Sequence, residues 1–138
     1  MSWNTAFHFM KGDPLNPFDW LAVARRDLQS FETLQNAGDI HMAGFCLQQA
    51  SEKALKGWLI GRGWALVKTH SLGRLQAEAL AYNLDLEWFT ATAERLSDLY
   101  FTDRYVDIAP DPEPTAAELA GLYADVTRLL ATLFPENP

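Results

Sequence analysis

The chain has 138 residues, a formal net charge of −7, 49% hydrophobic residues and 12% aromatic residues. Its length suffices for one domain with a real core and is too short for two ordinary domains, and its apolar content exceeds that of a disordered chain. The single cysteine, Cys46, excludes an internal disulfide. No apolar run of transmembrane length and no secretory leader is present, so we expect a soluble, cytoplasmic protein.

The charges are unevenly distributed along the chain. Residues 1–74 contain eight Lys and Arg against six Asp and Glu, a balance of +2, whereas residues 75–138 contain three against twelve, a balance of −9. The net acidity opposes strong non-specific binding to nucleic acid or to an anionic membrane. The basic residues in the middle of the chain still allow a local anion site there, or simply a solvated surface.

Hydrophobic spacing predicts helices throughout, and Gly and Pro fall where helices would end. The first helix is expected to begin at Pro17, with Asn16 as its N-cap, and to end at Ala37-Gly38 after about 20 residues. The second is expected to begin after Asp39 and to run to about Arg62, with Cys46 as a small core residue. Residues 1–15 would form an N-terminal extension.

Three further helices are expected. A short one follows His70-Ser71 and ends before Asn83, and a fourth begins near Asp85. The proline-rich loop 107–114 must end the fourth helix, and the last helix starts with a capping box from Thr115 to Glu118. Short connections between long helices favour an all-α, up-and-down antiparallel bundle of about five helices, four long and one short, in a single domain over 1–138.

The second helix has a stripe of polar residues in otherwise apolar surroundings. Five side chains fall within an arc of about 140° on a helical projection, opposite the apolar face: Gln48, Gln49, Glu52, Lys53 and Lys56. One interpretation is a solvated face supported by the Glu52 to Lys56 pair. The other is a contact with a ligand or with a second subunit.

General active-site signatures are absent from the sequence. Gly61-Arg62-Gly63 lacks the context of a phosphate-binding loop, and there is no metal-binding or serine-hydrolase motif, so we expect no metal and no cofactor. His70 is a candidate for acid-base chemistry or phosphate binding, or a residue that helps to cap the third helix. Arg104 is a candidate anion ligand or a structural residue at a helix C-terminus, and Asp107 would pair with it or begin the turn.

Four stretches of the chain resemble the HEPN family, the higher-eukaryote and prokaryote nucleotide-binding domains. Trp20 to Leu28 is similar to the family's W-x-x-x-A-x-x-D-L pattern. Cys46 to Lys56 is similar to its C-x-x-Q-Q-A-x-E-K-A-L-K signature, with one residue fewer between Cys46 and Gln48. His70-Ser71-Leu72 resembles the H-x-L entry to the third helix. Tyr100 to Asp107 resembles Y-x-x-x-R-Y-P-D, with Val106 in place of the usual proline.

The resemblance implies a bundle of about five helices that commonly forms a homodimer. It also implies a frequent partner, a minimal nucleotidyltransferase, within a toxin-antitoxin or related system. Ribonuclease branches of the family rely on Arg-x(4-6)-His, which this chain lacks, since seven residues separate Arg62 from His70. Other branches are proposed to bind nucleotides without cutting RNA. The residues implied for a shared polar site are Gln49, Lys53, His70, Arg104, Tyr105 and Asp107.

Three functional hypotheses follow from these patterns. The leading one is a non-catalytic HEPN module that binds a nucleotide or a nucleotidyltransferase partner, with Lys53, Lys56 and Arg104 on phosphate and Tyr105 stacked on a base. The second is a metal-independent ribonuclease toxin using His70 with Arg62 or Arg104. The third is a structural adaptor whose polar stripe serves only dimerisation.

Overall fold

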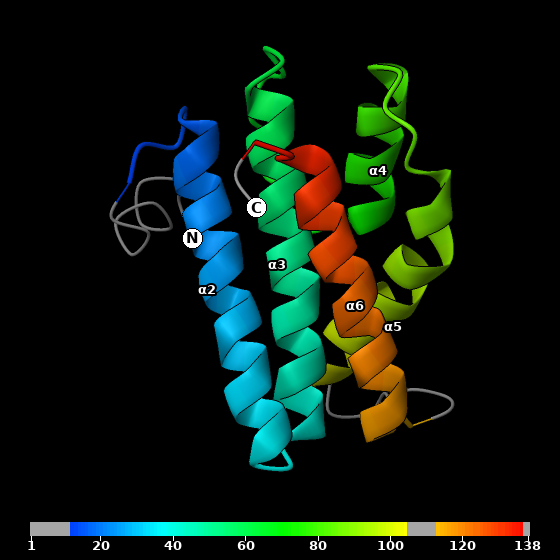
Figure 1. Cartoon of the computed structure of the whole chain (residues 1–138). Helices are drawn as coiled ribbons and strands as arrows, with labels where there is room; N and C mark the ends of the chain where they lie inside the picture. Colours follow the sequence, from blue (N-terminus) through cyan, green and yellow to red (C-terminus); the bar gives the residue numbers. More distant parts are fainter. Residues whose placement is uncertain (1–11, 105–112, 137–138) are drawn as a thin grey trace.

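The computed structural model describes residues 12–104 and 113–136, the last four residues before the gap by their backbone alone. Over these residues the chain is all-α (Figure 1). The elements are α2 (Pro17–Asn36), α3 (Ile40–Ile60), α4 (Leu72–Ala81), the 3-10 helix η1 (Glu87–Phe89), α5 (Thr90–Arg104) and α6 (Ala116–Leu133). Most of the predicted extension 1–15 and of the predicted loop 107–114 lies outside the described residues.

The first two helices form an antiparallel hairpin whose ends agree with the predictions. The Asn16 side chain accepts a hydrogen bond from the backbone N–H of Phe18, and Pro17 occupies the first turn of α2. Gly38 takes the left-handed φ of 81° that the tight turn into α3 requires, and Asp39 caps α3. The hairpin packs closely because Gly57 places the α3 backbone directly against Trp20.

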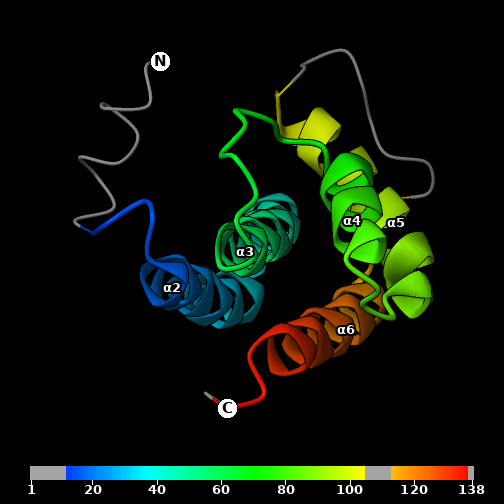
Figure 2. The ribbon, with the colours of Figure 1, turned by 90° about the horizontal axis from the view of Figure 1, so that it is seen from above.

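Helix α3 is the centre of the bundle and packs against each of the other four α-helices. Seen from above, α2 lies on one side of α3 and α4 with α5 on the opposite side, while α6 lies between these two groups (Figure 2). The side chains of Leu47, Ala50, Ala54, Leu55 and Leu59 are fully buried along α3, and the predicted core residue Cys46 is buried as well. Since α3 has neighbours around most of its circumference, little of its surface is left for solvent.

The start of the fourth helix differs from the prediction. The chain makes the 3-10 turn η1 before α5 begins at Thr90, about five residues after the expected start near Asp85. The buried side-chain amide of Gln76 donates to the Leu86 carbonyl and to Thr90 Oγ1, both at 2.8 Å, which fixes this tighter turn against α4. The predicted apolar stripe is nevertheless correct, since Leu86, Phe89, Ala93, Leu96 and Tyr100 are all buried.

Helix α6 begins as predicted, with the Thr115 hydroxyl accepting from the backbone N–H of Glu118. The Glu118 carboxylate does not complete the capping box but binds the Arg95 guanidinium through two hydrogen bonds of 2.8 and 2.9 Å. The predicted inner face of α6 is buried. None of the helices that the structure describes combines the length and the apolar character needed to cross a bilayer.

Candidate functional site

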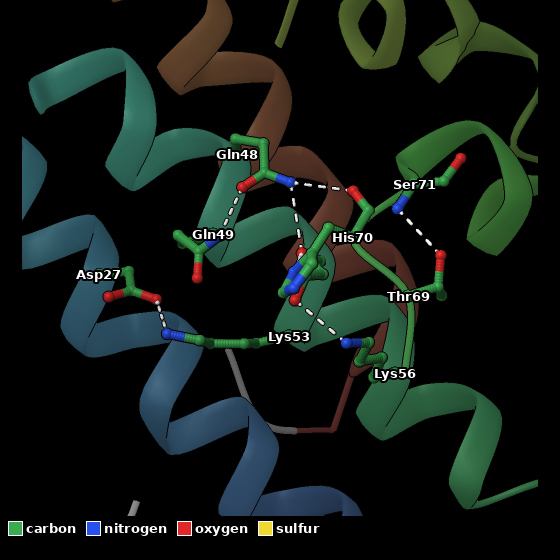
Figure 3. Close-up of polar contacts among 9 residues, drawn as sticks. Asp27, Gln48, Gln49, Lys53, Lys56, Thr69, His70 and Ser71 are labelled. Carbon is green, nitrogen blue, oxygen red and sulfur yellow. Dashed lines mark hydrogen bonds and ion pairs between the residues drawn. The ribbon is translucent and has the colours of Figure 1, made fainter. Parts of the chain in front are cut away.

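The polar stripe of α3 is buried, so its interpretation as a solvated face is wrong. Gln48, Glu52 and Lys56 are only 1%, 3% and 3% exposed, while Gln49 and Lys53 are half-buried. The stripe escapes solvent because α2 lies along one flank of α3 and the segment 69–71 that leads into α4 crosses the other (Figure 3). Buried polar groups are stable only when they are hydrogen-bonded, so their partners define the site.

Glu52 is at the centre of the network. Its Oε1 lies 3.0 Å from His70 Nδ1 and accepts from the Gln48 side-chain amide at 3.3 Å. Its Oε2 lies 3.1 Å from Lys56 Nζ, one helical turn further along α3, as the predicted pair requires. A carboxylate held in this way is a fixed negative charge that orients both the imidazole and the ammonium group.

The electrostatics favour the ionised form of this carboxylate. Burial by itself raises the pKa of Glu52, but the hydrogen bond from His70 and the charges of Lys56 and His70 together outweigh it, so the pKa lies below its ordinary value. Glu52 is therefore an anion at neutral pH. It neutralises Lys56 inside the protein rather than leaving that lysine available as an isolated cation.

The two glutamines extend the network to the backbone and to the neighbouring turn of the helix. The Gln48 amide donates to the His70 carbonyl at 3.3 Å, and the Gln49 amide donates to Gln48 Oε1 at 2.6 Å. These bonds fix the loop that carries His70 onto α3. The cap of α4 is Ser71, whose hydroxyl accepts from the Arg74 backbone N–H. The His70 ring is thus not needed as a cap.

Lys53 forms the second ion pair of the site. Its Nζ lies 2.8 Å from Asp27 Oδ2 on α2, and both side chains are 21% exposed. Burial raises the pKa of Asp27 above its ordinary value, and the neighbouring Lys53 only partly opposes this. The pair therefore lies in a poorly hydrated position at the edge of the network.

The imidazole of His70 also belongs to an aromatic stack. It lies 5.7 Å from the Tyr100 ring with an interplanar angle of 25°, and Tyr100 lies 5.9 Å from the Phe45 ring with an angle of 16°. The His70 side chain is still 52% exposed. With Nδ1 directed at Glu52, the ring is held in a fixed orientation, and Nε2 is the ring nitrogen that does not face the carboxylate.

The structure brings together four of the predicted site residues, Gln49, Lys53, Lys56 and His70 (Figure 3). The backbone of Arg104 ends α5, but its side chain is not among the described ones, and Tyr105 and Asp107 lie outside the described residues. Arg62 is not part of the site. It follows the end of α3, and about 12 Å of helix rise separates Glu52 from Ile60.

Four residues of the network were not among the predicted site residues: Asp27, Gln48, Glu52 and Tyr100. Gln48 and Glu52 were recognised as members of the stripe, and all four residues occupy fixed positions of the quoted family patterns. Their pairing depends on how α2 and α5 pack against α3, which spacing within one helix does not report. Within 12–104 and 113–136, no three His, Cys, Asp or Glu side chains are grouped to hold a metal ion.

Comparisons with known proteins agree with this architecture. The crystal structure of TT1696 from Thermus thermophilus is 30% identical in sequence, with a TM-score of 0.72 over 86% of this chain and 96% of that one. The crystal structure of ST0689, an archaeal HEPN homologue, is 25% identical, with a TM-score of 0.66 over 88% of this chain and 97% of that one. The comparison with curated proteins found no match. The model of the HEPN domain matches residues 18–133, and the chain therefore belongs to the HEPN family.

Proposed function

We propose that this protein is a HEPN module that binds a nucleotide at the α3 network, defined as Gln48, Gln49, Glu52, Lys53, Lys56 and His70. The observation that carries the proposal is the burial of this polar stripe in a connected set of hydrogen bonds with one half-exposed ring at its edge. A stripe that only aided solubility would have no reason to be buried and oriented. Preorganised polar groups of this kind reduce the ordering cost of binding a ligand.

The charges of the network suggest how a nucleotide would be held. Lys56 is neutralised by the buried Glu52, whereas Lys53 shares a more accessible pair with Asp27. A phosphate would therefore approach Lys53 and the outer edge of His70, and the aromatic surface of His70 would meet the base. The role first predicted for Lys56, a direct phosphate ligand, is better replaced by that of a cation that balances Glu52.

Calorimetric titration with ATP, GTP, ADP and GDP tests the proposal. His70→Gln and Lys53→Met should each weaken the binding about tenfold or more, since a hydrogen bond to a charged group contributes about 1.5–3 kcal/mol. His41→Gln is the matched control, because its side chain is also 52% exposed and lies elsewhere, beside Glu113. Failure of the parent protein to bind any of the four nucleotides would refute nucleotide binding. An equal loss of affinity in His41→Gln would refute the location of the site at the α3 network.

The proposal includes a protein partner and self-association. Because the chain belongs to the HEPN family, we propose that it forms a homodimer in the cytoplasm. We also propose that it works with a minimal nucleotidyltransferase, as in toxin-antitoxin pairs. Light scattering on the eluted protein should then give twice the mass of 15.5 kDa. If a minimal nucleotidyltransferase is encoded beside this protein, co-expression of the two should give one complex. A monomer at micromolar concentration would refute the dimer and, with it, an adaptor role that depends on dimerisation.

A metal-independent ribonuclease is the second candidate, and one observation favours it. The pairing of a buried carboxylate with a half-exposed imidazole is an arrangement suited to general acid-base catalysis, since Glu52 orients the ring and Nε2 does not face the carboxylate. Arg104 would have to supply the charge for the phosphate, because Arg62 lies at the far end of α3. Purified protein that leaves RNA intact, or a His70→Ala variant that cleaves as fast as the parent, would exclude it.

A further inference from the structure

The start of α2 and the ends of α3 and α6 lie at the same end of the bundle (Figure 1). A recess of about 310 Å³ lies there, called here the end pocket. The residues that line it include Phe18, Trp58, Arg62, Phe134 and Glu136. It shares no residue with the α3 network, and its chemistry is different.

The walls of the end pocket are apolar and aromatic. The rings of Phe18 and Phe134 lie 6.1 Å apart at an angle of 56°, and Trp58 is buried beneath them with 5% exposure. Phe18 is nevertheless 55% exposed, and Leu15, three residues earlier, is 72% exposed. Large apolar side chains gathered around a concave surface are typical of a binding site rather than of ordinary protein surface.

Arg62 supplies the positive charge of this pocket. Its guanidinium carbon lies over the Trp58 ring, 4.1 Å from the ring centre, and Arg62 as a whole is exposed. Among the described residues Arg62 has no ion-pair partner, not even Glu136 on the same rim. Arg95, in contrast, is satisfied by the two oxygens of Glu118.

The backbone around Arg62 is also fixed. The Gly61 N–H donates to the Gly57 carbonyl at 3.2 Å, the Arg62 N–H to the Leu59 carbonyl at 2.9 Å, and the Gly63 N–H to the Ile60 carbonyl at 3.0 Å. A guanidinium group that is stacked on a buried indole and carried by a hydrogen-bonded turn loses little freedom when it binds an anion. Planar guanidinium groups bind carboxylates with two parallel hydrogen bonds.

We propose that the end pocket binds a small carboxylic acid with an aromatic or branched apolar body, the carboxylate on Arg62 and the body between Phe18, Trp58 and Phe134. The volume sets the size, since about 300 Å³ is the lower limit of small-molecule pockets and accommodates one ring system rather than a whole nucleotide. The proposal is independent of nucleotide binding, because the two sites use different residues at different places on α3.

The probe for this site is 3-phenylpropionate, with the uncharged 3-phenylpropanamide as its isostere, titrated by calorimetry and by amide NMR. The parent protein should bind the acid with a Kd of about millimolar or tighter, as expected for a fragment of this size. The NMR shifts should be confined to residues 15–20, 57–63 and 133–136. Arg62→Gln should weaken the acid about tenfold or more and leave the amide unchanged, whereas Phe18→Ser should weaken both compounds.

Arg128→Gln is the matched control. The guanidinium carbon of Arg128 also lies over a tryptophan, 3.9 Å from the centre of the Trp88 ring, but Arg128 does not line the end pocket. The same loss of acid binding in Arg62→Gln and Arg128→Gln would overturn the proposal. So would the absence of saturable binding to the parent protein, or binding that neither Arg62→Gln nor Phe18→Ser changes. His70→Gln should leave the binding of the acid intact.

Discussion

The buried pair of Glu52 and Lys56 makes a strong, testable prediction about stability. The side chains of Lys56 and Glu52 are 4% and 5% exposed, and their charged atoms lie 3.1 Å apart. Removing one partner of a buried ion pair leaves the other charge poorly compensated, which costs about 3–5 kcal/mol, whereas removing both is often nearly neutral. Glu52→Gln and Lys56→Met should therefore each destabilise the fold by about 3 kcal/mol or more.

The double variant Glu52→Gln/Lys56→Met tests whether the two charges stabilise each other. Independent effects would add to about 6 kcal/mol or more, beyond the stability of many domains of this size. We expect the double variant to be no less stable than the worse single variant, a coupling energy of about 3 kcal/mol. The coupling arises because the second substitution removes the charge that the first has left without its counterion.

Urea denaturation followed by circular dichroism measures these free energies. Glu94→Gln on the exposed face of α5 is the control for replacing a glutamate and should change stability by less than about 0.5 kcal/mol. Additive losses in the double variant would refute the reasoning. They would mean that Glu52 and Lys56 are stabilised by their other neighbours, such as His70, rather than by each other.

Two further predictions concern pH and backbone packing. The pKa of Glu52 is lowered on folding, so the ionised carboxylate contributes its full stabilisation above the ordinary pKa of 4.5. This contribution is lost as the pH falls through the lowered pKa. The free energy of unfolding should therefore fall less steeply with acid in Glu52→Gln than in the parent protein. The raised pKa of Asp27 acts in the opposite direction, and a steeper acid loss in Glu52→Gln would contradict the assignment. Gly57→Ala should lower the Tm. A Cβ at this position would lie 2.6 Å from Trp20 Cβ and 3.0 Å from the Pro17 carbonyl oxygen. The cost of such overpacking, about 1–3 kcal/mol, exceeds the gain in helix propensity from glycine to alanine. A Cβ at Gly121 would meet no neighbouring side chain or backbone of another element within 4 Å, so Gly121→Ala should raise the Tm through helix propensity alone. A change in Tm of the same sign in both variants would refute the steric argument.

Local sequence signals were sufficient for most of the fold. The Asn16-Pro17 start of α2, the Asp39 cap of α3, the Ser71 start of α4 and the Thr115 cap of α6 are all decided by hydrogen bonds within a few residues. The buried faces follow from the helical period in the same way. The exception is the start of α5, because the turn that delays it is fixed by Gln76 from another helix.

The candidate site was also predicted only in part from local sequence signals. Spacing within one helix is enough to predict which residue types share one face of α3, and the family motif singles out the same residues. The burial of this face depends on the packing of separate elements, as do the bond of Glu52 to His70 across 18 residues of chain and that of Lys53 to Asp27 across 26. Such pairs form because α2 and the loop before α4 are packed against α3. The end pocket has the same origin, since it exists only where the ends of three helices meet.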